Sequence, residues 1–162
     1  MKRDASMVWV AILAGLATPA VACPLAEAEG PNRLRLQPPM TSEIFTGFGM
    51  RPHPILVIPK FHTGVDYAAN VGDSVRAAAA GKVTMAGPNG AYGNAVTIQH
   101  GNGFETAYGH LHRIGVKEGD CVEGGAIIGK AGSTGLVAGP QLHFEVRQGG
   151  EPLDPAVMLA RP

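Results

Sequence analysis

The chain has little of what marks several common protein classes. It contains only two cysteines, Cys23 and Cys121, neither has the neighbours of a catalytic nucleophile, and no Cys-x-x-Cys pair is present. Its 13 basic and 13 acidic residues balance, without a basic stripe or an acidic tail. Proteins that bind nucleic acid concentrate positive charge on one face, so nucleic acid is not an expected partner.

Long helical patterns are missing too. No amphipathic stretch of three helical turns follows Cys23, whereas 23 glycines and 13 prolines, without a fixed period, predict many turns and therefore many short strands. The predicted fold class is all-β, mostly antiparallel, in a single domain. Strands are expected at residues 42–48, 74–79, 81–86, 95–100, 104–110, 116–122, 126–131 and 142–147.

The N-terminus reads as an export signal. Lys2 and Arg3 precede an apolar run at residues 7–17, which is too short to span a bilayer, and Ala20-Val21-Ala22 resembles a cleavage site. We therefore expect residues 1–22 to be a signal peptide and the mature protein to be periplasmic or extracellular.

Two interpretations of Cys23 remain open. A cysteine directly after the cleavage point is a lipid anchor in lipoproteins, although Ala20 stands where leucine is usual. Alternatively, Cys23 and Cys121 form a disulfide in an oxidising compartment. The Pro-rich residues 23–40 are interpreted as a linker, residues 41–155 as the folded domain and residues 156–162 as a C-terminal tail.

Two distant segments carry metal-ligand chemistry. Residues 62–66 read His-Thr-Gly-Val-Asp, and residues 139–146 read Gly-Pro-Gln-Leu-His-Phe-Glu-Val. Side chains alternate along a strand, so Gln141 and His143 face the same side, toward whatever His62 and Asp66 help to build. Two histidines and a carboxylate are a zinc ligand set with a fourth position left for water. Gly64, between two of these ligands, allows close backbone approach.

Other segments suggest proton transfer and a cleft wall. Alternation places Tyr108 and His110 on one face of a strand, and His110 is the better candidate for moving a proton near neutral pH. His100 and His112 are interpreted as structural or turn histidines, and residues 55–61 as a loop beside the site. The Gly-rich segment with Ser133 and Thr134 lacks the sequence of a phosphate loop and predicts a cleft wall.

Six ordered segments together resemble the lysostaphin-like M23 family of zinc metallopeptidases, with LytM-type peptidoglycan endopeptidase domains. They cover about residues 41–155 and read TGFGMRPHP, HTGVD, GNAVTIQH, TAYGHL, VKEGDCVEGGAIIGKAGSTG and GPQLHFEVR. The resemblance implies a β-sheet fold of the duplicated hybrid motif type with a long groove, one zinc ion and cleavage of peptidoglycan peptides.

The resemblance also implies residue roles. His62, Asp66 and His143 match the zinc ligands, His110 matches a catalytic histidine, and Tyr108, Ser133 and Thr134 match the substrate groove.

Gln141 departs from the family pattern. It stands at the catalytic position where the family has a second histidine, and an amide can donate a hydrogen bond but cannot accept a proton at neutral pH. Two functions therefore remain open. One is a zinc metalloendopeptidase weakened by Gln141, and the other is a catalytically impaired, zinc-bearing cell-wall-binding regulator of other peptidoglycan hydrolases.

Overall fold

The computed structural model describes residues 23, 34–52, 55 and 58–160, so the predicted signal peptide lies outside the described residues. The strands of the main sheet are β1 (Ile44–Thr46), β4 (Val65–Ala68), β5 (Ser74–Arg76), β6 (Gly81–Pro88), β7 (Asn94–Gln99), β8 (Phe104–Ile114), β9 (Cys121–Val122), β10 (Ile127–Ala131), β11 (Gln141–Gln148) and β12 (Glu151–Leu153). A separate hairpin consists of β2 (Gly49–Pro52) and β3 (Pro59–His62). Short 3-10 turns, Gly90–Tyr92 and Gly101–Gly103, flank β7.

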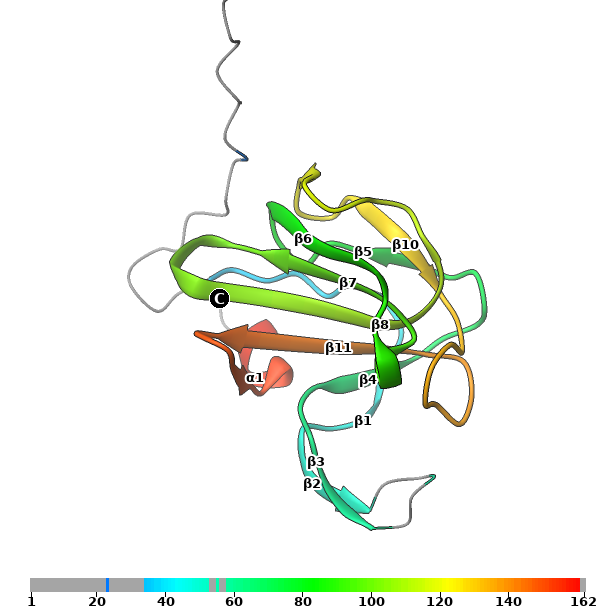
Figure 1. Cartoon of the computed structure of the whole chain (residues 1–162). Coiled ribbons are helices and arrows are strands. Elements are labelled where there is room, and N and C mark those ends of the chain that lie inside the picture. The colour runs from blue at the N-terminus through cyan, green and yellow to red at the C-terminus, as the bar shows by residue number, and fades with distance from the viewer. Residues whose placement is uncertain (1–22, 24–33, 53–54, 56–57, 161–162) are drawn as a thin grey trace, which may run out of the picture.

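All strand pairs in the described part of the chain are antiparallel, which confirms the predicted all-β class. The central order is β1-β4-β11-β8-β7-β6-β9, with β10 pairing β5 and β8, and β12 pairing β11 (Figure 1). Neighbours such as β4 and β11 lie far apart in sequence. The sheet therefore gathers side chains from both ends of the domain.

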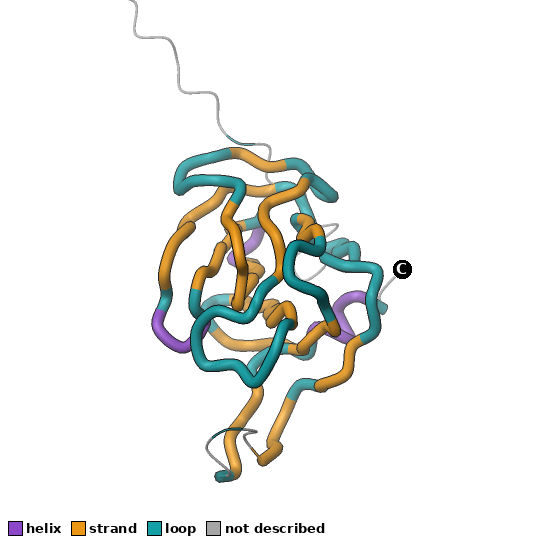
Figure 2. The backbone as a smooth tube through the Cα atoms, turned by 90° about the vertical axis from the view of Figure 1, so that its right-hand side faces the viewer, coloured by secondary structure: helices purple, strands orange, loops and turns teal. Residues whose placement is uncertain are grey.

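The hairpin β2–β3 corrects the prediction of a loop at residues 55–61 for its last three residues, 59–61, which lie in β3. Arg51 pairs with Lys60 and Gly49 with His62, so this segment returns as a strand into the metal-binding motif. Both views show the hairpin projecting from the main sheet (Figure 2). Pro52 and Pro59 close the far end of the pairing, where prolines are tolerated because no ladder hydrogen bond is required of them.

The prediction that Tyr108 and His110 lie on one face of β8 is corrected by the structure. Phe104, Thr106 and Tyr108 point into the core as a regular strand requires, but His110 has φ +63°, which breaks the alternation. Tyr108, on the core-facing side, is fully buried and does not line the groove predicted for it, whereas the irregular backbone at His110 turns that residue toward the cavity described below.

A chain of hydrogen bonds runs through the buried polar groups of this core. The Ala78 N–H donates to the Tyr108 hydroxyl (2.8 Å), which donates to Thr106 Oγ1 (2.9 Å). Thr106 donates to His100 Nε2 (2.8 Å), and His100 Nδ1–H donates to the Ala80 carbonyl (2.8 Å). This order, which gives every group in the chain a partner, corresponds to a neutral His100, and burial lowers the pKa of His100 in agreement with it.

Part of the predicted linker belongs to the domain. Leu34 and Met40 are buried, 2% and 7% exposed. The backbone N–H of Gln37 donates to the Ala78 carbonyl (2.9 Å), and the backbone N–H of Arg76 donates to the Pro39 carbonyl (3.0 Å). The prolines hold this segment extended, and its apolar side chains cover the core, so residues 34–40 are not a free linker.

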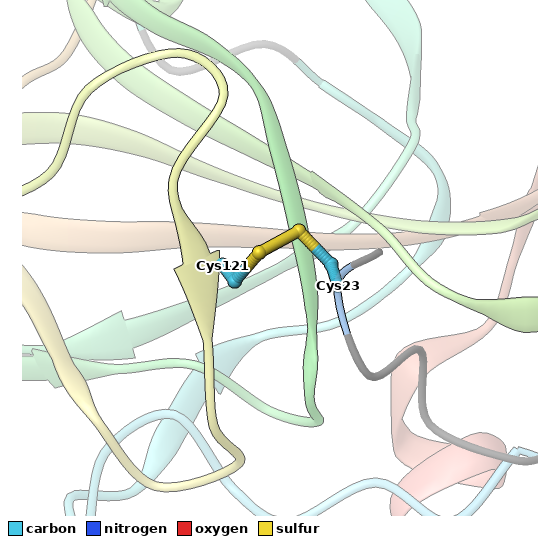
Figure 3. The surroundings of a disulfide bond; sticks show 2 residues. All are labelled: Cys23 and Cys121. Carbon is cyan, nitrogen blue, oxygen red and sulfur yellow. A yellow bond between two sulfur atoms is a disulfide. The ribbon is translucent and has the colours of Figure 1, made fainter. Parts of the chain in front are cut away.

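The two cysteines are joined. Cys23 and Cys121, at the start of β9, form a disulfide that ties the N-terminal segment to the sheet (Figure 3). This is one of the two alternatives left open by the sequence. Because the same sulfur cannot also carry a thioether lipid, the bridge rules out a lipid anchor at Cys23 in the disulfide-bonded form.

The predicted C-terminal tail begins as a short helix, α1 (Pro155–Leu159). Its N-cap is Asp154, whose carboxylate accepts from the Ala156 amide (2.9 Å), and Met158 is buried. The tail prediction is therefore wrong for residues 156–159. In the described part of the chain, no helix has the length and hydropathy needed to cross a membrane.

We expect acid to destabilise the fold through His100. In the folded state its pKa is below the ordinary value, whereas the unfolded histidine binds a proton below about pH 6.5. Its contribution is therefore complete above about pH 6.5 and is lost as pH falls toward the folded pKa, by at most about 1.4 kcal/mol per pH unit. Urea unfolding at pH 7.5 and 5.5 should show a smaller pH effect in His100→Asn than in the wild type.

The control for this prediction is His112→Asn, because His112, on β8, is an exposed histidine. Equal pH dependence in His100→Asn and His112→Asn would contradict the role assigned to His100.

Candidate active site

Three side chains from separate strands converge at one end of the sheet. His62 ends β3, Asp66 lies in β4 and His143 lies in β11, directly opposite Asp66 in the strand register. Their potential ligand atoms all lie within 4.8 Å of one another. The structure thus brings together the three residues predicted as metal ligands.

The separations suit a small tetrahedral ion. His62 Nε2 lies 3.2 Å from Asp66 Oδ1 and 3.2 Å from His143 Nδ1, and His143 Nδ1 lies 2.8 Å from Asp66 Oδ1. Zinc bound at about 2.0–2.1 Å in a tetrahedron requires ligands about 3.3 Å apart. The donor set and its spacing therefore fit zinc.

Hydrogen bonds on the outer side of both histidines fix their tautomers. His62 Nδ1–H donates to the Gly47 carbonyl (2.7 Å), and His143 Nε2–H donates to Glu145 Oε1 (2.9 Å). The lone pairs of His62 Nε2 and His143 Nδ1 are then left facing Asp66. Such outer partners orient imidazole ligands in zinc proteins.

Glu145 is a functional residue that sequence reasoning missed. It is fully buried and accepts hydrogen bonds from His143, Thr63 and Tyr92, and its other oxygen accepts from Arg147 Nε (2.7 Å). Burial alone would raise its pKa, but these donors lower it to about 2. The alternation of β11 placed Glu145 beside His143, but only the fold shows which partners surround it.

Gly64 lets β11 approach the loop between β3 and β4. A Cβ built there would lie 2.3 Å from the Phe144 carbonyl oxygen and 3.0 Å from His143 Cε1. Any side chain would displace the backbone that carries His143, so the close approach predicted at Gly64 is confirmed.

His110 is held as a neutral base. Its Nδ1–H donates to the Thr134 carbonyl (2.8 Å), which leaves the Nε2 lone pair available. Burial lowers its pKa, so the ring is mainly neutral at pH 7. The positive φ of this non-glycine residue costs of order 1–3 kcal/mol, a strain often found at functional sites.

The predicted groove residues of the Gly-rich segment lie elsewhere. Thr134 does not line the cavity; its hydroxyl donates to the Leu111 carbonyl (2.8 Å) and accepts from the Asn94 amide (3.0 Å), while its carbonyl positions His110. Ser133 is exposed and also absent from the lining. The wall is formed by the next residues, Leu136, Val137 and Ala138.

A cavity of about 350 Å³ opens over the three ligands. His110 and Gln141 both line it, and the rings of His110 and His143 have their centroids 5.9 Å apart. Gln141 begins β11, opposite Ala68, and its backbone N–H donates to the Gly132 carbonyl (3.0 Å). The remaining lining residues are Phe45, Thr46, Arg51, Lys60, Phe61, Thr63, Ala91 and Tyr92, besides the ligands and the wall already named.

Comparison with known proteins places the chain in a family. Residues 60–155 match the model of peptidase family M23, and the chain belongs to this family. The DD-carboxypeptidase/endopeptidase Mpg of Neisseria meningitidis serogroup B is 49% identical over 127 residues, which are 78% of this chain and 29% of that protein. The chain thus spans less than a third of that relative's length.

Solved structures agree with the fold. A zinc-containing peptidase from Vibrio cholerae superposes with a TM-score of 0.69 at 33% identity, covering 79% of this chain and 39% of that one. The catalytic domain of lysostaphin from Staphylococcus simulans gives a TM-score of 0.68 at 32% identity, covering 74% and 93%. The similarity therefore extends over most of that catalytic domain.

Glu145→Gln should weaken zinc binding by about 10–100-fold, as loss of an outer partner of a ligand histidine usually does. The substitution preserves shape but removes the charge that orients His143. Affinity is measured by competition with a chromophoric chelator. Glu123→Gln, at an exposed position, is the control. Unchanged affinity in Glu145→Gln would contradict the assigned role.

Zinc affinity should also rise with pH. Burial alone would lower the pKa of His143, but its contacts with Asp66 and Glu145 reverse this and raise it. Below that pKa, zinc must displace one proton, so affinity should increase about tenfold per pH unit and level off above it. Chelator competition from pH 5.5 to 8.5 measures the slope, and a flat profile would be inconsistent with a protonated His143 in the metal-free protein.

Proposed function

We propose that this chain is a zinc metalloendopeptidase that cleaves peptide bonds in peptidoglycan outside the cytoplasm. The observation that carries the proposal is the convergence of His62, Asp66 and His143 beneath a cavity that also presents His110. The family and the names of its relatives, which include DD-endopeptidases, support the substrate class. The predicted signal peptide supports export to a cell wall.

The chemistry that zinc supplies when held by His62, Asp66 and His143 is Lewis acidity toward a peptide carbonyl and an attacking water. The protein's own residues supply the rest. His110 Nε2 is the available acceptor for the proton of the attacking water, and the resulting imidazolium can return that proton to the leaving amine.

Gln141 has a more restricted role. Its amide N–H can donate to the oxyanion that develops on the carbonyl or can orient the attacking water, but it cannot take a proton. The whole of the proton transfer then rests on His110. This favours a slow hydrolase, and it is also the one observation that favours the second candidate, a zinc-bearing domain that binds cell-wall peptides and regulates other hydrolases.

Digestion of purified peptidoglycan by the zinc-loaded protein tests the proposal, with released fragments identified by mass and His143→Ala as control. Peptide-bond cleavage that is absent in the control is the expected result. No cleavage by a protein that holds one zinc per chain would reject the peptidase and favour the binding domain.

Gln141→His should increase the rate, because it supplies a second group able to exchange protons; a positioned acid or base typically contributes about 10²–10⁴-fold. His110→Ala should remove most activity for the same reason. Gln99→His, on the exposed side of β7, adds a histidine away from the cavity and is the control. Equal or slower hydrolysis by Gln141→His would show that proton transfer does not limit the wild-type enzyme.

A further inference from the structure

Tyr92 lies between the two histidines that line the cavity from β8 and β11. It is the last residue of the 3-10 turn Gly90–Tyr92, and its half-buried side chain also lines the cavity. The centroid of its ring lies 5.5 Å from that of His143, and the two ring planes are tilted by 53°. Tyr92 therefore borders both the cavity and a proposed zinc ligand.

The hydroxyl of Tyr92 is bonded within the protein. It donates to Glu145 Oε1 (2.8 Å) and accepts from Arg147 Nη2 (3.2 Å). The same oxygen of Glu145 accepts from His143 Nε2 (2.9 Å), so the hydroxyl and the ligand imidazole meet at one carboxylate oxygen. A hydroxyl has a single proton to donate, and Tyr92 uses it in the bond to Glu145. The hydroxyl thus holds Glu145 in place and does not supply a proton to a substrate.

The ring of Tyr92 packs on the strand that carries His110. A Cβ built on Gly109 would lie 3.2 Å from Tyr92 Cδ1 and 3.5 Å from the Tyr92 carbonyl oxygen. Gly109 directly precedes His110, which has φ +63°. A positive φ at a non-glycine residue persists only where the surrounding structure determines it. The ring of Tyr92 is one of the groups that determine the backbone at this point.

The turn that ends at Tyr92 is also fixed to the loop that anchors His110. The backbone N–H of Leu136 donates to the Ala91 carbonyl (2.8 Å). Two residues earlier in the same loop, the Thr134 carbonyl accepts from His110 Nδ1 (2.8 Å). Tyr92 is therefore held in a fixed position relative to the group that orients His110.

We propose that Tyr92 is a positioning residue that orients the ligand His143 through its hydroxyl and places His110 through its ring. The part that concerns His110 rests on the proposed peptidase function, whereas the part that concerns His143 rests on zinc binding alone. Loss of the hydroxyl should therefore weaken zinc binding, and loss of the ring should also impair proton transfer.

Zinc affinity, measured by competition with a chromophoric chelator, tests the role of the hydroxyl. Tyr92→Phe keeps the ring and should lower the affinity about fivefold, the effect of one hydrogen bond. Tyr108→Phe is the matched control, because it removes a hydroxyl from the core network and should leave zinc affinity unchanged. Residues of one network are not additive, so the loss in the double variant Tyr92→Phe/Glu145→Gln should be smaller than the product of the two single losses.

Three results would overturn the role of the hydroxyl. They are unchanged affinity in Tyr92→Phe, an equal loss of affinity in Tyr108→Phe, and single losses that multiply in the double variant.

Hydrolysis of a soluble cross-linked peptidoglycan fragment, by variants that each hold one zinc per chain, tests the role of the ring. Tyr92→Leu removes the ring as well as the hydroxyl, so its zinc affinity should equal that of Tyr92→Phe. Its kcat should be lower than that of Tyr92→Phe by about tenfold or more, because displacement of a catalytic group by about 1 Å can cost about 10²-fold. Equal kcat in the two variants would overturn the role of the ring. If the wild type cleaves nothing, the proposed function fails together with the role of the ring, and the zinc affinities still decide the role of the hydroxyl.

Discussion

The pairing of β4 with β11 is the constraint on which the site depends. It sets Asp66 directly opposite His143, 77 residues further along the chain, and the same ladder continues through Val65 and Phe144 into the core. A slip of one residue would turn His143 away from Asp66 and expose Phe144. The burial of the apolar face of β11 therefore fixes the geometry of its polar face.

Two buried carboxylates at the site each form an ion pair with an arginine. Asp66 is paired with Arg51 and Glu145 with Arg147. Burial would raise the pKa of each carboxyl, but hydrogen bonds from the neighbouring histidines, above all His143, lower it, so both carboxylates stay ionised. Glu145 in turn orients His143. Because all these groups are held by strands and not by loops, the ligands need little rearrangement to bind a metal ion, which is the condition for a tight site.

Much of this was predictable, and the failures have physical causes. The ligand residues followed from strand alternation around His143 and from the glycine between His62 and Asp66. Alternation failed at His110, because its positive φ takes it off the core-facing side that Tyr108 occupies. The role of Thr134 and the partners of Glu145 depend on contacts between distant strands, which no local pattern encodes.

An X-ray absorption spectrum at the zinc edge tests the central claim most directly. The account predicts one zinc per chain, bound by two imidazole nitrogens and by oxygen at about 2.0–2.1 Å. In His62→Ala, either one imidazole should be lost from the spectrum or zinc should no longer be retained. Sulfur in the coordination sphere, an all-oxygen shell, or an unchanged spectrum in His62→Ala would contradict a site built by His62, Asp66 and His143.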